Sequence, residues 1–269
     1  RLVVQNLCVR KPRYRTGLNL TRLSLKEAVE FIGFPCYLKY TQRHIEAVSS
    51  HLILYSEADY EAAQDKIALG TCILEAWIPS EKVVSLSVVR NERGELLVYP
   101  PFEQVQSSAV SGTQVRYPVK LHEEVEREIR RLGRYLVETL TLVGCMTIDF
   151  LVTSAGVVYI NSVEIGAKDA AMFTLGAMSL SCYEAMVRSV VGLPLPSLVP
   201  LADAAIALPL EALNADQVMT QYMLRTDWGF ALFNPMGRNP LDLEGQVIVT
   251  GESLAHCQRQ IELTDILKK

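Results

Sequence analysis

The sequence predicts an α+β fold built on antiparallel sheets. Short apolar strands and amphipathic helices are mixed in irregular order, and tight turns join several successive strands. Asn91-Glu92-Arg93-Gly94 is one such turn, and Thr153-Ser154-Ala155-Gly156 is a second. A regular strand–helix–strand repeat, which would predict a parallel sheet, does not occur. The 269 residues suffice for one large domain or two modest ones.

The first part of the chain predicts helices and strands of modest length. A helix is predicted over 24–32, because Ser24 is a favourable N-cap and Glu27 completes a capping box. Gly33-Phe34-Pro35 then ends this helix. The further elements are, in order, a strand ending at Lys39, a strand over 52–55, a helix over 58–69 and a strand over 71–78 that carries Glu75.

The middle of the chain combines two hairpins with a long helix. Apolar residues recur at helical spacing over 121–142, which predicts one amphipathic helix. A second helix is predicted over 174–191, where Gly192-Leu193-Pro194 stops it. The predicted strands lie at 82–90, 95–99, 146–152 and 157–161.

A change of character near Leu195-Pro196-Ser197-Leu198-Val199-Pro200 indicates a linker. We therefore predict a first domain over 1–196 and a small β-rich domain over 197–269. The elements predicted after the linker are strands over 201–208, 230–234 and 246–249 and a last helix from Ser253.

Composition excludes some classes of function. The net charge of −4 gives no overall attraction to nucleic acid or to an anionic membrane. Hydrophobic residues make up 49% of the chain, yet no apolar run is long enough for a membrane span. This excess favours either large protein–protein interfaces or a well-filled core. Six scattered cysteines without a Cys-x-x-Cys pair predict an intracellular, reducing compartment, either cytoplasmic or mitochondrial or otherwise organellar.

The chain opens with a basic leader over 1–22. No acidic residue occurs before Glu27, whereas seven cationic residues do. Such a leader could contact RNA or an acidic partner, and a solvated arm is the alternative. Because the first residue is Arg1 rather than Met, we expect that a targeting peptide, a domain or further residues precede it.

The order of several segments resembles a known family. "GFPCYLK", "CILEAWIPSEKVVSLSVVR", "VYPPFEQVQ", "TIDFLVTSAGVVYINSVE" and "YEAMVRSVVGLPL" occur in this order. They resemble the ATP-grasp core of N5-carboxyaminoimidazole ribonucleotide synthase. "GFALFNPMGRNPLDLEGQVIVTG" resembles the small C-terminal β-domain of that family. The resemblance runs at least from Gly33 to Gly251 and lacks the family's N-terminal domain. It implies an ATP-grasp fold, in which two α+β lobes clamp ATP.

The same resemblance implies a nucleotide site. Lys39 matches the strand lysine that reaches the nucleotide phosphates as a point charge. Glu75 matches the glutamate of the adenine pocket, whereas the family's ribose-binding glutamate falls at Val83. The family's loop Gly-Tyr-Asp-Gly-Lys-Gly-Gln falls at 44–50, where this chain has no glycine. The strand and its lysine are retained, but the glycine cradle for phosphate is not.

A magnesium site is implied further along the chain. The family pattern of Glu followed by Asn-Glu falls at Asp149, Asn161 and Ser162, so one carboxylate is shortened and one is lost. Glu164 lies two residues on, hence on the same strand face, and can substitute if the strand continues. Asp149, Asn161 and Glu164 are thus the candidate metal ligands.

The substrate-binding positions of the family differ more strongly. Its loop Ala-Pro-Arg-Pro-His-Asn-Ser-Gly-His falls at 164–172, with the arginine at Gly166 and the last histidine at Met172. An asparagine and a histidine of the family fall at Gln104 and Gln106. The C-terminal Arg-Lys-x-Gly-His signature falls at 242–246, and the cation pair is absent there.

Three interpretations follow, of which we favour the first, that the chain is more likely not an enzyme. In the first, the chain is a catalytically inactive subunit with a vestigial ATP site at Lys39 and Glu75, no cofactor and no catalytic residue. It would then serve as a structural module for other protein subunits, in a multi-enzyme or ribonucleoprotein assembly. In the second, the chain is an active ATP-dependent ligase of purine biosynthesis that uses ATP and magnesium. In the third, it senses nucleotide without turnover.

Overall fold

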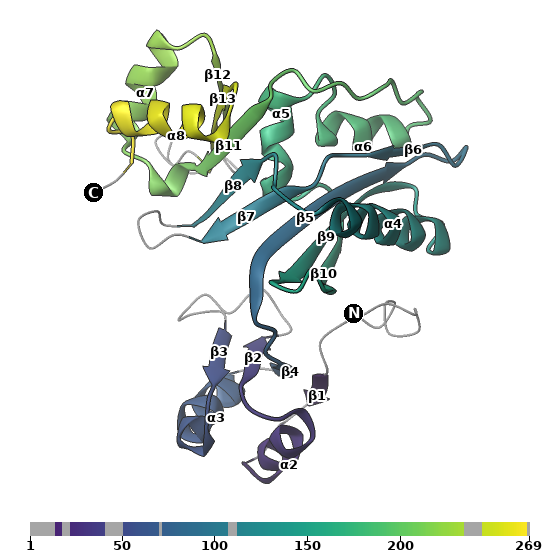
Figure 1. Ribbon diagram of the computed structural model, residues 1–269, viewed down its shortest axis with the longest axis vertical. Helices are drawn as coiled ribbons and strands as arrows, with labels where there is room; N and C mark the ends of the chain where they lie inside the picture. Colours follow the sequence, from purple (N-terminus) through teal and green to yellow (C-terminus); the bar gives the residue numbers. More distant parts are fainter. Residues whose placement is uncertain are drawn as a thin grey trace. The chain divides into compact units, whose positions relative to one another are not determined.

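The computed structural model describes residues 14–17, 22–40, 51–69, 72–106, 112–233 and 244–267. The chain divides into two compact units at the boundary between Pro79 and Ser80. The smaller unit precedes this boundary and the larger one follows it (Figure 1).

The smaller unit is an antiparallel sheet with helices on one face. Among the described residues the sheet has four strands in the order β1-β4-β2-β3. The elements are β1 (Tyr14–Gly17), α2 (Arg22–Ile32), β2 (Cys36–Tyr40), β3 (His51–Leu54), η1 (Glu57–Asp59), α3 (Tyr60–Leu69) and β4 (Cys72–Ala76). Alternate strand residues such as Leu38 and Leu74 form one buried core with Leu25 and Val29 of α2 and Ala63 of α3. Both helices therefore cover the same face of the sheet, and the polar strand residues lie on the other.

The larger unit is built on a single long sheet. Its strands are β5 (Ser80–Arg90), β6 (Leu96–Val98), β7 (Phe102–Gln106), β8 (Thr113–Tyr117), β9 (Gly144–Thr153), β10 (Val158–Ile165), β11 (Ala204–Pro209), β12 (Trp228–Phe233) and β13 (Glu244–Gly251). The described strands pair in the order β10-β9-β5-β7-β8-β11-β13-β12, with β6 beside β5. The pairings are antiparallel throughout, as the hairpin pattern predicts.

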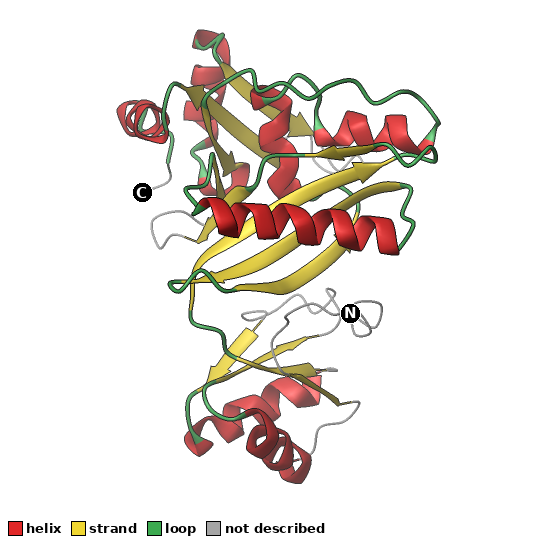
Figure 2. Cartoon of the chain, turned by 45° about the vertical axis from the view of Figure 1, so that its right-hand side comes forward, coloured by secondary structure: helices red, strands yellow, loops and turns green. Residues whose placement is uncertain are grey.

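Helices pack on both faces of this sheet. They are α4 (Glu123–Thr139), η2 (Asp169–Phe173), α5 (Thr174–Ala177), α6 (Cys182–Val190), η3 (Leu210–Ala212), α7 (Ala215–Leu224) and α8 (Leu254–Leu263). Helix α4 lies along one face (Figure 2), where Ile129 and Leu136 pack against Leu86, Ile148 and Phe150 of β5 and β9. On the opposite face α6 packs near Cys145 and Val89.

Most of the predicted elements are confirmed, with corrections at their ends and joints. Helix α2 begins at Arg22, so Ser24 lies inside its first turn and is not the N-cap. The helix predicted over 174–191 is interrupted: α5 ends at Ala177, and Ser181 caps α6 by accepting the backbone N–H of Glu184 at 3.1 Å.

One further correction concerns the C-terminal part. Helix α7 occupies a polar stretch where no element is predicted, and the side chain of Asn214 caps it. Beyond the predicted linker, β11 pairs with β8 and so extends the sheet of the larger unit. The boundary at 196 stays a prediction about domain organisation, whereas the compact units divide at 79/80. The basic leader over 1–22 lies largely outside the described residues.

Within the part of the chain that the structure describes, no helix combines the length and apolarity that a membrane crossing requires. The five cysteines described there (Cys36, Cys72, Cys145, Cys182 and Cys257) are buried, and none of these five forms a disulfide.

Candidate functional site

The smaller unit brings two predicted nucleotide residues together on its sheet. Tyr37 on β2 lies directly opposite Glu75 on β4, and Lys39 follows two residues later on the same face. The Lys39 Nζ lies 2.6 Å from Glu75 Oε2 and 5.6 Å from the centre of the Tyr37 ring. Burial, and secondarily the charge of Glu75, raises the pKa of Tyr37. A cation is thus held in a defined place by a mostly buried carboxylate.

The Lys39–Glu75 pair is compatible with the roles that the resemblance implies. An ammonium group binds phosphate oxygens as a compact point charge. The loop over 44–50, where the resemblance places further phosphate contacts, lies outside the described residues. The prediction for that loop therefore stays a prediction.

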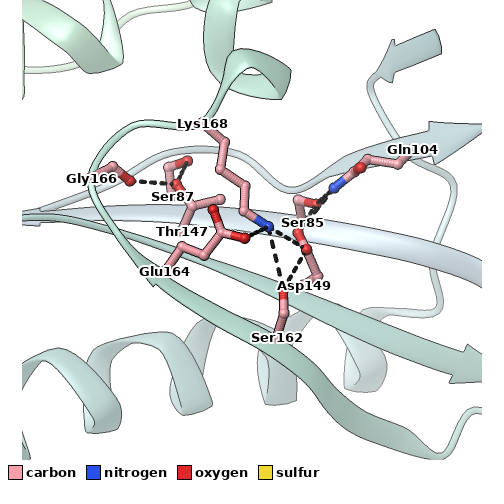
Figure 3. A network of polar contacts seen from close by, with 9 residues as sticks. All are labelled: Ser85, Ser87, Gln104, Thr147, Asp149, Ser162, Glu164, Gly166 and Lys168. Carbon is pink, nitrogen blue, oxygen red and sulfur yellow. Dashed lines mark hydrogen bonds and ion pairs between the residues drawn. The ribbon is translucent and has the colours of Figure 1, made fainter. Parts of the chain in front are cut away.

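The larger unit carries a polar cluster on the sheet face opposite α4. In β5, Val84, Leu86 and Val88 face α4, and the alternating Ser85 and Ser87 face away from it. In β9, Thr147 and Asp149 lie opposite Ser87 and Ser85. These four polar side chains are buried. We call the residues around the aspartate the Asp149 cluster: Ser85, Gln104, Asp149, Ser162, Glu164 and Lys168 (Figure 3).

Asp149 is the centre of this cluster. Its Oδ1 accepts hydrogen bonds from Ser85 Oγ at 2.7 Å and Gln104 Nε2 at 2.9 Å. Its Oδ2 accepts from Ser162 Oγ at 2.6 Å and Lys168 Nζ at 2.5 Å. A carboxylate has about four lone-pair directions, so these four donors use its accepting capacity. One of the four donors is an ammonium group, so the carboxylate has a charged partner although only 10% of its side chain is exposed.

A β-bulge in β10 determines which of its side chains face this aspartate. The pairing of β10 with β9 shifts between Ile160 and Ser162, so Asn161 is the extra residue opposite Asp149. After the bulge, Ser162 faces Asp149, and Glu164 follows on the same face. The strand continues to Ile165, which meets the condition set for Glu164 by the sequence.

Lys168 joins the two carboxylates. Its Nζ lies 2.5 Å from Asp149 Oδ2, 3.1 Å from Glu164 Oε1 and 3.3 Å from Ser162 Oγ. The backbone of Lys168 is held by α6, because Tyr183 Oη donates to the Lys168 carbonyl oxygen at 2.8 Å. Thr147 Oγ1 also donates to the Gly166 carbonyl oxygen at 3.1 Å. Figure 3 shows the ammonium pointing toward the side chains of Asp149, Ser162 and Glu164.

The sequence reasoning missed Lys168 and Ser85 as members of the cluster. Two signals were present. Ser85 and Ser87 alternate with Val84 and Leu86, which indicates a polar sheet face, and Lys168 follows the acidic residue Glu164 at a spacing of four. Gln104 was identified only as a departure from the family pattern, and in the structure it binds Asp149.

The candidate metal ligands do not form a metal-binding set in this arrangement. Asp149 and Glu164 are brought together, but an ammonium lies between them where a divalent cation would have to bind. Among the residues that the structure describes, no group of three or more His, Cys, Asp or Glu side chains could hold a metal ion. The residues present therefore fit an internal ammonium better than magnesium. The assignment of Asp149, Asn161 and Glu164 to a metal stays a prediction.

Other positions singled out by the resemblance lie apart from this cluster or outside the description. Met172 is buried in η2. Gln246 is buried on β13, and its Oε1 has no hydrogen-bond partner within the described part of the chain. Residues 242 and 243 lie outside the described residues.

Comparison with known proteins supports the resemblance. The ATP-grasp domain model matches residues 2–183. N5-carboxyaminoimidazole ribonucleotide synthase of Bacillus subtilis (strain 168) is 27% identical over 175 residues, which is 65% of this chain and 46% of that protein. Formate-dependent phosphoribosylglycinamide formyltransferase of Chlorobaculum tepidum is 28% identical over 216 residues, 78% of this chain and 54% of that protein. The chain thus spans about half the length of these curated relatives.

Solved structures share the fold. An ADP complex of N5-carboxyaminoimidazole ribonucleotide synthetase has a TM-score of 0.87 at 23% identity and covers 98% of this chain and 68% of that one. The carboxyaminoimidazole ribonucleotide synthase from Aspergillus clavatus complexed with ATP has a TM-score of 0.82 at 18% identity and covers 98% and 70%.

These findings correct the interpretation that the chain is more likely not an enzyme. That interpretation rested on motif residues that are absent, whereas the relatives that match the chain are named as a synthase and a formyltransferase. Loss of a motif residue is weak evidence against activity, because a different side chain can supply the same charge. The match over residues 2–183, together with the shared fold, shows that the chain belongs to the ATP-grasp family.

Proposed function

We propose that this chain is the ATP-grasp part of an ATP-dependent ligase that attaches a one-carbon carboxylate to the amine of a ribonucleotide. The N5-carboxyaminoimidazole ribonucleotide synthase reaction of purine biosynthesis is the specific form that we favour. The observation that carries this proposal is the match of the ATP-grasp domain to residues 2–183. The similarity in fold to ADP and ATP complexes of such synthases supports it.

The proposed reaction has two steps. The γ-phosphoryl group of ATP passes to an oxygen of bicarbonate, and carboxyphosphate and ADP are formed. The amine then attacks the carboxyl carbon, the C–O bond to phosphate breaks, and the amine loses its proton. Both steps move negative charge between oxygens, so they are accelerated by positive charges held in fixed positions.

The chain supplies one such charge. In the smaller unit, Lys39 would bind nucleotide phosphate, and Glu75 fixes its ammonium group at 2.6 Å. Preorganised ammonium groups of this kind need no rearrangement when charge develops on a substrate.

ATP binding is tested by thermal and urea unfolding of the protein with ATP. ATP at about a hundred times its Kd should raise the free energy of unfolding by about 2.7 kcal/mol. Lys39→Met should weaken ATP binding about tenfold or more, because a charge-assisted hydrogen bond contributes about 1.5–3 kcal/mol. Lys120→Met, at an exposed lysine of the larger unit, is the matched control and should bind ATP like the wild type.

Turnover distinguishes the two activities named among the relatives. ADP release is measured with bicarbonate and 5-aminoimidazole ribonucleotide, and separately with formate and glycinamide ribonucleotide. The proposal expects ADP release in the first mixture. Release only in the second would move the function to the formyltransferase type. Absence of any ATP-dependent stabilisation at millimolar ATP would refute the proposal.

Contacts with other protein subunits, and with RNA through the basic leader, remain proposals supported only by the apolar composition and by the seven early cations. They are compatible with a ligase.

A further inference from the structure

The strongest unassigned feature of the larger unit is an ammonium group surrounded by acceptors. Lys168 has three N–H donors. Three acceptors lie within 3.3 Å of its Nζ: Asp149 Oδ2, Ser162 Oγ and Glu164 Oε1. The geometry thus accounts for every donor of this lysine inside the cluster.

The acceptor side is equally complete. Asp149 receives two hydrogen bonds on each carboxylate oxygen. Gln104 uses its amide to reach both Asp149 at 2.9 Å and Ser85 Oγ at 2.5 Å. A metal ion could coordinate Asp149 only by displacing one of these donors, and Lys168 is the one that carries a competing positive charge.

The position of Lys168 is set by the fold and not by a flexible surface chain. Only 17% of its side chain is exposed. Its backbone is tied to α6 through Tyr183, and the preceding turn is tied to β9, where the Gly166 N–H donates to the Cys145 carbonyl oxygen at 2.8 Å. The bulge at Asn161 turns Ser162 and Glu164 to the same face. Two strands, β9 and β10, therefore contact the ammonium, and α6 holds the backbone that carries it.

We propose that Lys168 is the resident cation of the Asp149 cluster and occupies the position that a divalent cation would need. Two carboxylates and one ammonium leave a single net negative charge in the cluster. A divalent ion in place of the ammonium would neutralise both carboxylates, whereas one added beside the ammonium would meet a like charge at close range. Divalent cations bind between Asp149 and Glu164 only when the ammonium is removed.

The resulting site would accept a hard cation of the magnesium class. Its ligands would be the carboxylate oxygens of Asp149 and Glu164 and the hydroxyl of Ser162, and oxygen ligands suit Mg²⁺ and Mn²⁺. In the wild type the same three groups hold Lys168, so the carboxylates already have a cation without a metal.

The test is a titration of the nucleotide-free protein with Mn²⁺, followed by the electron paramagnetic resonance signal of free Mn²⁺. Lys168→Met, which keeps the length of the side chain and removes the charge, should gain one site per chain, at least tenfold tighter than any site of the wild type. Lys168→Arg, which keeps the charge, should gain none. Lys120→Met is the control for loss of an exposed lysine. Adding Asp149→Asn to Lys168→Met should abolish the new site.

Thermal unfolding gives an independent readout. Without metal, Lys168→Met should unfold at a lower temperature than the wild type, since two carboxylates lose their cation. Mn²⁺ should raise that temperature by several degrees while leaving the wild type unchanged. Lys168→Gln replaces Lys168→Met if the latter does not fold.

Two results would overturn the proposal. One is a Mn²⁺ site in the wild type that Asp149→Asn removes, because the ammonium would then not exclude the metal. The other is a folded Lys168→Met or Lys168→Gln protein without a new site. The first of these results overturns the proposal even if neither variant folds. Because no turnover is measured, these outcomes are separate from failure of the proposed ligase function.

Discussion

Replacing Asp149 by Asn and Lys168 by Met, singly and together, measures how strongly the two side chains depend on each other. In Asp149→Asn, an amide NH2 group, which only donates, replaces one of the two carboxylate oxygens. Each of these oxygens accepts two hydrogen bonds in the wild type. One face of the cluster then has donors turned toward donors. In Lys168→Met, two carboxylates lose the cation that they share. In the double variant the new amide no longer faces an ammonium, and only one carboxylate, that of Glu164, lacks its cation.

The magnitude follows from burial. The side chains of Asp149 and Lys168 are 10% and 17% exposed. Removing one partner of a buried ion pair lowers the free energy of unfolding by about 3–5 kcal/mol. Because this pair is slightly exposed, we expect a loss of about 3 kcal/mol for each single variant. Glu164 keeps a partial hold on Lys168 in the first variant. The double variant should lose only about 4 kcal/mol, which gives a coupling energy of about 2 kcal/mol.

The assay is urea unfolding followed by far-UV circular dichroism, with the free energies taken from midpoints and slopes. A control cycle on Glu123 and Arg127 uses an ion pair of α4 whose side chains are 86% and 68% exposed. Its coupling should not exceed about 0.5 kcal/mol. If the Asp149 and Lys168 variants are additive within about 0.5 kcal/mol, the ion pair described here does not form and the reasoning fails.

Two further predictions concern the backbone and the pH dependence. Gly245 has φ of +137°, and an added Cβ would overlap the carbonyl oxygen of Ala231 on β12, so Gly245→Ala should lower the free energy of unfolding by about 2 kcal/mol or more; an unchanged urea midpoint would contradict this. Burial raises the pKa of the Cys257 thiol from 9.0 to about 11. As the pH rises, the thiol of the unfolded chain ionises before the buried thiol does. The free energy of unfolding is therefore unaffected by Cys257 below pH 9 and falls as the pH rises to about 11. Cys257→Ala should reduce that loss between pH 8 and 10.5 in urea unfolding, and an identical pH slope would contradict it.

Local sequence patterns predicted the larger elements well. Helix α4 follows from the spacing of Val125, Ile129, Leu132 and Leu136, all of which are buried in the structure. The turn that ends at Gly94 and the cap of α8 at Ser253 were likewise visible in the sequence. These features depend on residues within a few positions of one another, so short windows contain the information that specifies them.

Two errors concern helices whose ends are set by side-chain hydrogen bonds to the backbone. The predicted helix over 174–191 is broken because Thr174 Oγ1 accepts the backbone N–H of Cys182 at 3.0 Å and the chain turns between them. The polar stretch before Trp228 folds as α7, although helix periodicity is weak there. In the first place this hydrogen bond outweighs the local preference for one continuous helix. In the second, the side chain of Asn214 caps the helix by accepting the backbone N–H groups of Asp216 and Gln217.

The sequence by itself determined that the chain is α+β, that it resembles the ATP-grasp family, and that Lys39, Glu75 and Asp149 lie on strands. Only the tertiary structure decided what surrounds them. Ser85 reaches Asp149 across 64 residues of sequence, and Lys168 reaches it across 19. Their meeting requires the pairing of β5 with β9, the bulge at Asn161 and the docking of α6. A comparison of motifs shows only that a carboxylate is missing at Ser162, whereas the fold places the Lys168 ammonium there. The physical reason is that a buried charge requires partners close in space, and those partners are distant in sequence.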